Sequence, residues 1–269
     1  MLLAPGAQVT DPSFVEEALR RDRLLVVFCL LLVVVLSWAY LLAGAGMSMQ
    51  AMGDMLTPMS TEPWTLGYAL LVLVMWTVMM AAMMLPSAAP MILVYATIAR
   101  RRSERGETAS ASSGVFAFGY LAIWAAFSLA ATALQFVLEK AALMSTTMQT
   151  TSVALAGAVL IAAGLYQWTP LKRACLRYCS SPLVFLMRYW RPGTAGAFSM
   201  GLRHGTYCVG CCWLIMLLLF VGGIMNFGWI AGIALFVLVE KLVPAGHWIG
   251  RGAGVLLVAW GAATLVAAS

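Results

Sequence analysis

The chain contains a series of apolar runs whose lengths approach the 17 to 25 residues or so that a helix needs to cross a lipid bilayer. Only 10% of the residues are charged and 63% are hydrophobic, so no segment has the composition of a soluble domain. We therefore expect an all-α, polytopic membrane protein with about seven transmembrane helices. The runs cover residues 24–42, 66–85 with a tail to 99, 115–138, 153–168, 206–225, 228–243 and 252–268.

The basic residues predict how these spans are oriented. All 16 Lys and Arg except Lys140 fall on one side of a seven-span arrangement, and loops rich in Lys and Arg stay in the cytoplasm. This pattern places the N-terminus in the cytoplasm and predicts a multi-pass protein of the bacterial inner membrane, with the lipid bilayer as a partner. The net charge of +6 is thus explained by topology, and no nucleic-acid partner is expected.

The domain organisation follows from the same pattern. Residues 1–23 include "DPSFVEEALRRDR", which is typical of a short amphipathic helix on the cytoplasmic side. Residues 24–269 are expected to form a single helical transmembrane domain. A basic inner loop at about 169–205, which contains two cysteines, lies within that domain.

The segment "GLRHGTYCVGCCWLIM" at residues 201–216 carries one His and three Cys. On a helix, His204, Cys208, Cys211 and Cys212 share a face with Met200, in a stripe about 120° wide. If the helix begins only after Gly205, His204 and Met200 approach the cysteines from a loop instead. A second pair, Cys175 and Cys179, has the i, i+4 spacing that also places both sulfurs on one side of a helix.

Three interpretations of this cluster stay open. Thiolates and imidazole are soft ligands that suit Cu(I) or Zn(II), and cytosolic thiols are kept reduced, which favours metal binding. Cysteine pairs near helix starts also serve redox chemistry. Alternatively, Cys packs as a small apolar residue, which is how we interpret the isolated Cys29.

The short "MNFGW" turn adds Glu240 to the neighbourhood of the cysteines, because an antiparallel pair of helices places it level with Trp213, beside Cys212. A carboxylate at that depth is expected to face protein or be protonated, as a structural group, a metal ligand or a proton carrier. Lys241 points about 100° away, so we expect it to reach the inner headgroups without pairing with Glu240.

Methionine thioethers provide further soft donors. In "MWTVMMAAMMLPSAAPM", the Met side chains of one face either fill gaps in the core or supply a path for a soft metal. Pro86 and Pro90 must disturb this helix, and we expect the break to lie beside the thiol-rich stripe. The predicted outer loop contains more Met, which either capture copper or form an interfacial surface. The Met residues considered as additional ligands are Met75, Met79, Met83, Met200, Met47, Met49, Met52 and Met55.

The motifs from Trp76 to Gly261 resemble a bacterial family of predicted metal-binding integral membrane proteins, known as a domain of unknown function. The similarity rests on "MWTVMMAAMMLPSAAP", "GLYQWTPLKRACLRYCSSP", "GLRHGTYCVGCCWLIM", "GGIMNFGWI" and "VEKLVPAG". It implies a multi-helix membrane protein with a metal site at Cys175, Cys179, His204, Cys208, Cys211 and Cys212. It implies no particular reaction.

The interpretation we favour is a non-enzymatic membrane protein that handles a soft metal, with no catalytic residue and no organic cofactor. Copper as Cu(I) is the expected ion, and zinc and iron are alternatives. The partner would be another membrane or periplasmic metalloprotein. The competing hypotheses are a thiol-disulfide or quinone-linked oxidoreductase that uses the C-V-G-C pair, and a structural or assembly subunit of a larger membrane complex.

Overall fold

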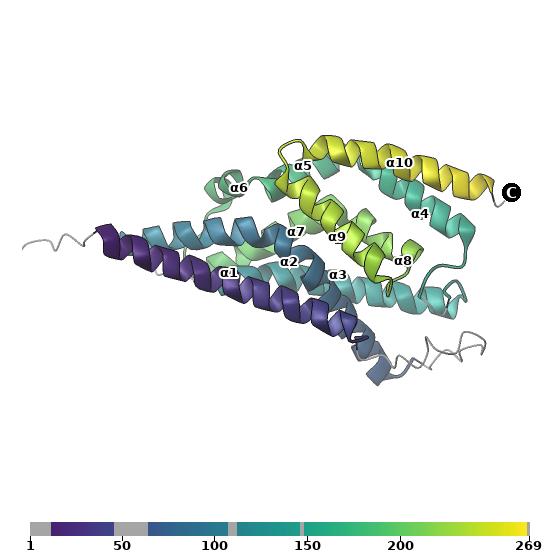
Figure 1. Cartoon of the computed structure of the whole chain (residues 1–269), viewed down its shortest axis with the longest axis horizontal. Helices are drawn as coiled ribbons and strands as arrows, with labels where there is room; N and C mark the ends of the chain where they lie inside the picture. The colour runs from purple at the N-terminus through teal and green to yellow at the C-terminus, as the bar shows by residue number, and fades with distance from the viewer. Residues whose placement is uncertain (1–11, 46–63, 107–111, 146–147, 268–269) are drawn as a thin grey trace, which may run out of the picture.

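The computed structural model describes residues 12–45, 64–106, 112–145 and 148–267, and these residues form a helical bundle (Figure 1). In these ranges the only β feature is an isolated bridge between Met144 and Thr150. The all-α class is therefore confirmed. The helices are α1 (Pro12–Leu42), α2 (Leu66–Glu104), α3 (Ser113–Lys140), α4 (Val153–Tyr166), α5 (Pro170–Ser180), α6 (Pro182–Tyr189), α7 (Gly193–Leu217), α8 (Leu219–Gly222), α9 (Phe227–Leu242) and α10 (Gly246–Val266).

The prediction of seven spans is not confirmed. Five helical stretches in the described ranges are long and apolar enough to cross a membrane: Arg23–Leu42, Leu66–Glu104, Ser113–Lys140, Gly193–Gly222 and Gly246–Val266. The helices α4 and α5 together would make a sixth, bent by 66°. Helix α9 has 16 residues and is about 24 Å long, which is less than the bilayer core of about 30 Å.

Two other boundaries differ from the expected ones. Helix α1 runs from Pro12 to Leu42 without interruption, so the short N-terminal helix and the first apolar run form one continuous helix. The segment 169–205 is not a loop, because it contains α5, α6 and the first part of α7. Since α7 already begins at Gly193, His204 and Met200 lie within the same helix as the cysteines that follow them.

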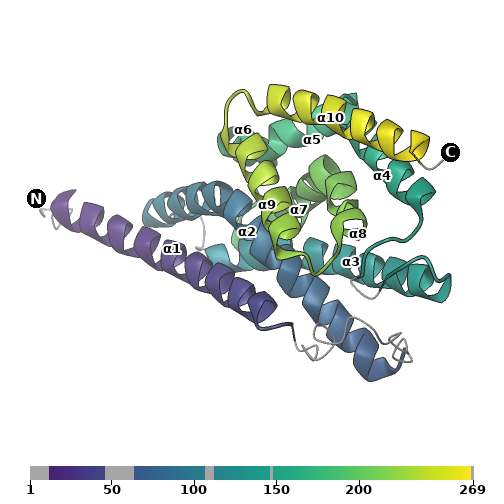
Figure 2. The ribbon, with the colours of Figure 1, turned by 45° about the vertical axis from the view of Figure 1, so that its right-hand side comes forward.

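Helix α7 lies in the interior of the bundle, and α3 packs along it (Figure 2). The two backbones approach closely at glycines. A Cβ atom on Gly201 would collide with the carbonyl oxygen of Phe116, and one on Gly119 would collide with that of Phe198. Helices α4 and α10 pack in the same way on the other side, where Gly164 faces Gly254. Small residues allow such close helix packing. The close contact with α3 fixes the position of α7.

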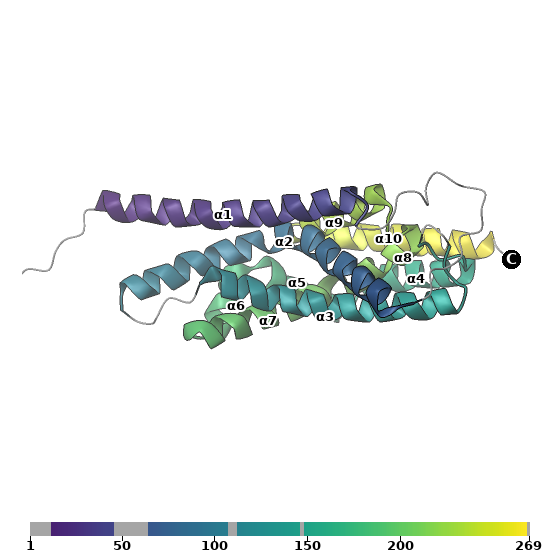
Figure 3. The same cartoon turned by 90° about the horizontal axis from the view of Figure 1, so that it is seen from below.

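Helix α2 contains both prolines and changes direction along its length (Figure 3). Pro86 and Pro90 lack the backbone N–H that a regular helix needs. Next to them the Ser87 hydroxyl donates to the carbonyl of Met84 over 2.9 Å, and the Tyr120 hydroxyl of α3 donates to the same carbonyl over 3.2 Å. Side chains thus supply hydrogen bonds to the backbone where the helix is disturbed.

Replacing Gly201 by Ala should destabilise the protein by roughly 1 to 3 kcal/mol, because the added methyl group forces α3 and α7 apart. Gly232→Ala is the matched control, since nothing lies within 4 Å of a Cβ at that position, and removal of a helical glycine should stabilise by about 0.5 to 1 kcal/mol. Thermal unfolding of both variants in detergent, followed by circular dichroism, measures the difference. Equal stability of the two variants would show that the close approach does not exist.

Candidate metal centre

The predicted stripe on α7 lies in the protein interior. Met200, His204 and Cys208 are each 1% exposed, and Cys211 and Cys212 are fully buried. These five side chains follow the spacing of one helical face, and the structure confirms that this face is turned inward. The sequence spacing therefore predicted correctly which residues α7 presents to its neighbours.

Helix α5 adds the second pair of cysteines to this face. Thr169 caps the helix by accepting a hydrogen bond from the backbone of Lys172, and Pro170 occupies its first turn. The Cys179 side chain is 6% exposed and lies near the thiols of Cys208 and Cys211. The Cys175 sulfur lies against Gly210 of α7, only 2.8 Å from where a Cβ atom would be. Five of the six cysteines, all except Cys29, therefore lie along the contact between α5 and α7.

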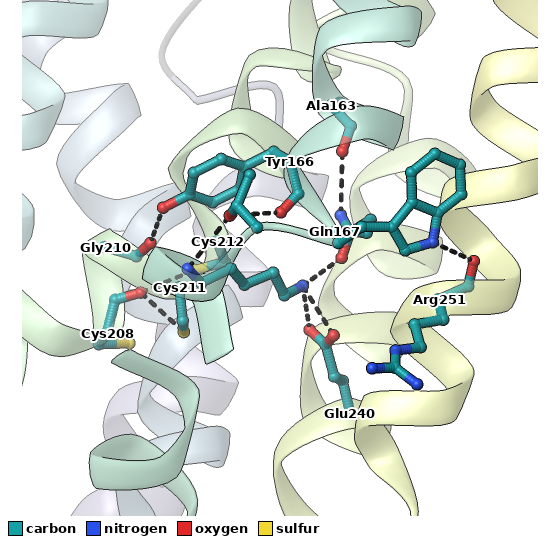
Figure 4. A network of polar contacts seen from close by, with 12 residues as sticks. Ala163, Tyr166, Gln167, Cys208, Gly210, Cys211, Cys212, Glu240 and Arg251 are labelled. Carbon is teal, nitrogen blue, oxygen red and sulfur yellow. Dashed lines mark hydrogen bonds and ion pairs between the residues drawn. The ribbon is translucent and has the colours of Figure 1, made fainter. Parts of the chain in front are cut away.

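The thiols of α7 have internal hydrogen-bond partners. Cys211 and Cys212 both donate to the carbonyl oxygen of Cys208, over 3.1 Å and 3.0 Å, and Figure 4 shows the three residues together. Among the described residues, no three His, Cys, Asp or Glu side chains are already arranged as the ligands of one metal ion. The cluster gathers soft donors, and a change of thiol rotamers is needed to point several of them at one atom.

His204 is enclosed by aromatic rings. It stacks on Tyr120 and Phe116, at centroid distances of 5.4 Å and 6.0 Å, and meets Phe185 edge-on at 5.4 Å. Its Nδ1 atom makes no hydrogen bond to any described residue. A buried polar atom without a partner is uncommon, and a neutral imidazole nitrogen is a good metal ligand. This nitrogen is one turn of α7 away from Cys208.

A hydroxyl pair lies next to this aromatic enclosure. The hydroxyls of Tyr189 and Tyr207 are 2.8 Å apart. This hydrogen bond is the main reason that the pKa of Tyr189 is below its usual value, and the neighbouring Arg188 and Arg203 lower that pKa further. The two arginines thus place positive charge beside this pair of hydroxyls.

The most unexpected residue in the site is Lys241. Its Nζ atom is 2.9 Å from the Cys208 sulfur and 3.1 Å from the Ser87 hydroxyl, and the residue is only 4% exposed. The expectation that Lys241 reaches the headgroups is therefore wrong. The physical reason is that polar atoms of α2 and α7 meet the end of α9 and satisfy the ammonium group inside the bundle. Tyr120 adds a further contact, with its hydroxyl 3.1 Å from the same sulfur.

The position of Ser87 also answers the question of where the break in α2 lies. Ser87 follows Pro86 directly, and the Lys241 ammonium contacts both the Ser87 hydroxyl and the Cys208 sulfur. The disturbed part of α2 is therefore beside the thiol-rich stripe, as the sequence predicts.

Glu240 faces protein, as expected, but its partner is not a cysteine. Its two oxygens lie 2.7 Å and 2.8 Å from Lys172 Nζ, and the Lys172 ammonium also donates to the side-chain oxygen of Gln167 (Figure 4). Glu240 and Lys172 are each 2% exposed. Lys172 was not among the predicted site residues, because a Lys in a basic segment indicates topology first. Its spacing to Cys175 and Cys179, i+3 and i+7, indicates the shared face.

The methionines have separate locations. Met75, Met79 and Met83 are at most 1% exposed within α2, where they contribute to the core that surrounds the site. Met47, Met49, Met52 and Met55 lie outside the described residues.

Glu240→Gln should destabilise the protein by about 3 to 5 kcal/mol, because it leaves the Lys172 ammonium buried without a counter-charge. The double variant Lys172→Met with Glu240→Leu should recover most of this loss, since well-packed apolar residues can replace a buried ion pair. Thermal unfolding in detergent checks both. A double variant that is no more stable than Glu240→Gln would contradict this account.

Comparison with known proteins gives one match. A family model described as PpoB2, a copper chaperone, matches residues 73–264, which is most of the chain. No curated protein and no solved structure matches. The matched region includes α3 to α9, most of α2 and nearly all of α10. It therefore contains His204 and all the cysteines except Cys29. The match agrees with the metal-related family expected from the motifs. The chain belongs to the PpoB2 family of copper chaperones.

Proposed function

We propose that this chain is an integral membrane protein that binds copper as Cu(I) at the contact between α5 and α7 and passes it to a partner metalloprotein. The observation that carries the proposal is the burial of Cys208, Cys211 and Cys212 on one face of α7, with the buried Cys179 of α5 near the first two. Copper is the cargo in this account, and no residue acts as a catalyst.

The donor set supports copper on chemical grounds. Thiolates and an imidazole are soft ligands that favour Cu(I) over hard cations. The unpartnered Nδ1 of His204 is the neutral nitrogen donor nearest to the thiols on the same face. The copper chaperone family agrees with this choice.

Lys241 supports a thiolate site inside an apolar bundle. Two thiolates and one Cu(I) ion together carry one negative charge, and an uncompensated charge in such surroundings is costly. The Lys241 ammonium, 2.9 Å from Cys208, supplies the opposite charge. The Lys172 and Glu240 pair is neutral on its own, so it leaves this balance unchanged.

The proposal also includes a membrane location and a path for the ion. The long apolar helices would place the protein in a bacterial inner membrane with its N-terminus in the cytoplasm. The thioethers of Met75, Met79 and Met83 would then offer a soft path along α2, and the Met residues of the preceding segment would collect the ion outside. The metal would be retained at the cysteines of α5 and α7.

Purified protein reconstituted with Cu(I) without oxygen should retain about one copper ion per chain. The triple variant Cys208→Ser, Cys211→Ser, Cys212→Ser should retain none, because it lacks the main soft donors. Cys29→Ser is the control, since Cys29 is exposed and outside the cluster. Elemental analysis with X-ray absorption counts the metal and its sulfur and nitrogen ligands. Equal copper in all three proteins would reject the proposal.

The two cysteines of α5 should differ in importance. Cys179 interacts with two thiols of α7, whereas Cys175 lies against Gly210. Cys179→Ser should therefore weaken Cu(I) binding at least about tenfold, roughly 1.4 kcal/mol, and Cys175→Ser should weaken it less. Competition with a Cu(I) chelator measures both affinities. A larger effect at Cys175 would mean that the ion binds at the other end of the contact.

A further inference from the structure

A pocket lies beside the cluster, where the end of α9 and the start of α10 meet α5. Its volume is about 400 Å³. The charged residues in its lining are Arg173, Arg177, Glu240 and Arg251, with His247 beside them. In Figure 4, Arg251 and the three cysteines of α7 lie on opposite sides of Glu240. The pocket is therefore separate from the thiol-rich site, and Glu240 lies between the two.

The arginines of this pocket have no acidic partner among the described residues. None of the three forms an ion pair with a carboxylate of the described residues, and Glu240 is already paired with Lys172. Two of the guanidinium groups lie instead near aromatic rings, with Arg251 4.8 Å from the centroid of Trp248 and Arg177 5.6 Å from that of Tyr178. Such contacts hold a guanidinium in place and leave its N–H donors available.

Local structure explains why the arginines converge. Arg173 and Arg177 are four residues apart on α5 and therefore share a face, while Cys175 and Cys179 on another face are turned inward. Arg251 comes from the second turn of α10. The two helices are distant in sequence, and their charges meet at one concave surface.

The start of α10 contributes a further positive potential. Its cap residue, Ala245, makes no side-chain hydrogen bond, and Gly246 and His247 line the pocket. The helix dipole favours an anion near this end, while the N–H groups of Gly246 and Trp248 already donate to the carbonyls of Val243 and Ala245. A Cβ atom on Gly246 would collide with the carbonyl oxygen of Glu240, so only glycine allows the helix to begin this close to α9.

We propose that this pocket binds a phosphate group, carried by an anionic phospholipid headgroup or by a free phosphate. Arginine forks are donors that recognise phosphate oxygens, and the dipole of α10 adds a positive potential at the pocket. Three guanidinium groups that form no ion pair within the described part of the chain provide the charge for a dianion or a phosphodiester. Leu242 and Trp248, which are 51% and 62% exposed beside the pocket, offer an apolar surface for the acyl chains of a lipid.

The phosphate site has a structural link to the thiols. Arg173 and Arg177 are on the helix that carries Cys175 and Cys179, and the opposite wall belongs to α9 and α10. A phosphate bound between them joins α5 to α9 and α10, in addition to the Lys172 and Glu240 ion pair. It therefore holds α5 in the position that brings its cysteines to α7.

The test uses the full chain in neutral detergent and three probes: phosphatidylglycerol, phosphatidylcholine and inorganic phosphate. The variant replaces Arg173, Arg177 and Arg251 by Gln. Its matched control replaces Arg188, Arg191 and Arg203 by Gln, because these arginines lie outside the pocket. Native mass spectrometry counts bound lipid, and thermal unfolding measures stabilisation by each probe.

We expect phosphatidylglycerol to remain bound to the wild type and the control, and its retention to fall at least tenfold in the pocket variant. Stabilisation by inorganic phosphate alone, lost in the same variant, would identify a free phosphate as the source. Retention of both anionic ligands by the pocket variant at wild-type levels would overturn the proposal. A wild type that binds neither anionic probe better than phosphatidylcholine would also overturn it. If the triple variant does not fold, Arg177→Gln is compared with Arg188→Gln by the same criteria.

Copper content is measured on the same samples. A wild type that binds phosphate but no copper would reject the proposed function and leave the phosphate site intact. A wild type that binds copper without a preference for anionic probes would reject the phosphate site and leave the proposed function intact.

Discussion

The contact between the Lys241 ammonium and the Cys208 sulfur determines much of the surrounding geometry. A buried charge costs several kcal/mol unless polar atoms surround it, and Lys241 is almost fully buried. Helix α7 supplies the sulfur and α2 supplies the Ser87 hydroxyl, so both must approach the end of α9. In the disturbed segment of α2, the Met84 carbonyl accepts hydrogen bonds from the hydroxyls of Ser87 and Tyr120. The burial of one ammonium thus relates three helices that are far apart in sequence.

Two consecutive residues of α9 direct charge into different networks. Glu240 joins Lys172 and Gln167 near the bend between α4 and α5, whereas Lys241 joins α2 and α7. The angle of about 100° between successive helical residues keeps the networks apart. One network is neutral, and the other holds a positive charge beside thiols. This separation suits the proposed copper site, in which the thiols would become anionic on binding the ion.

The sequence was most informative where the pattern was local. Helical spacing correctly predicted the buried face that carries His204 and Cys208, and the prolines correctly predicted the break beside it. The direction of Lys241 was not predictable, because it depends on where Ser87 lies in the folded chain. The predicted seven spans are not confirmed, because hydropathy alone does not reveal the bend after α4 or the shortness of α9.

The division of the sulfur atoms between α5 and α7 has a mechanical consequence. Helix α5 has eleven residues, begins at Pro170, ends two residues before Pro182 and follows α4 after a bend of 66°. Rotation of this short segment about the bend changes the spacing between Cys179 and the α7 thiols without breaking a hydrogen bond inside either helix. A rigid-body motion of α5 would therefore change the distances between these sulfur atoms, and the ion pair between Lys172 and Glu240 opposes that motion.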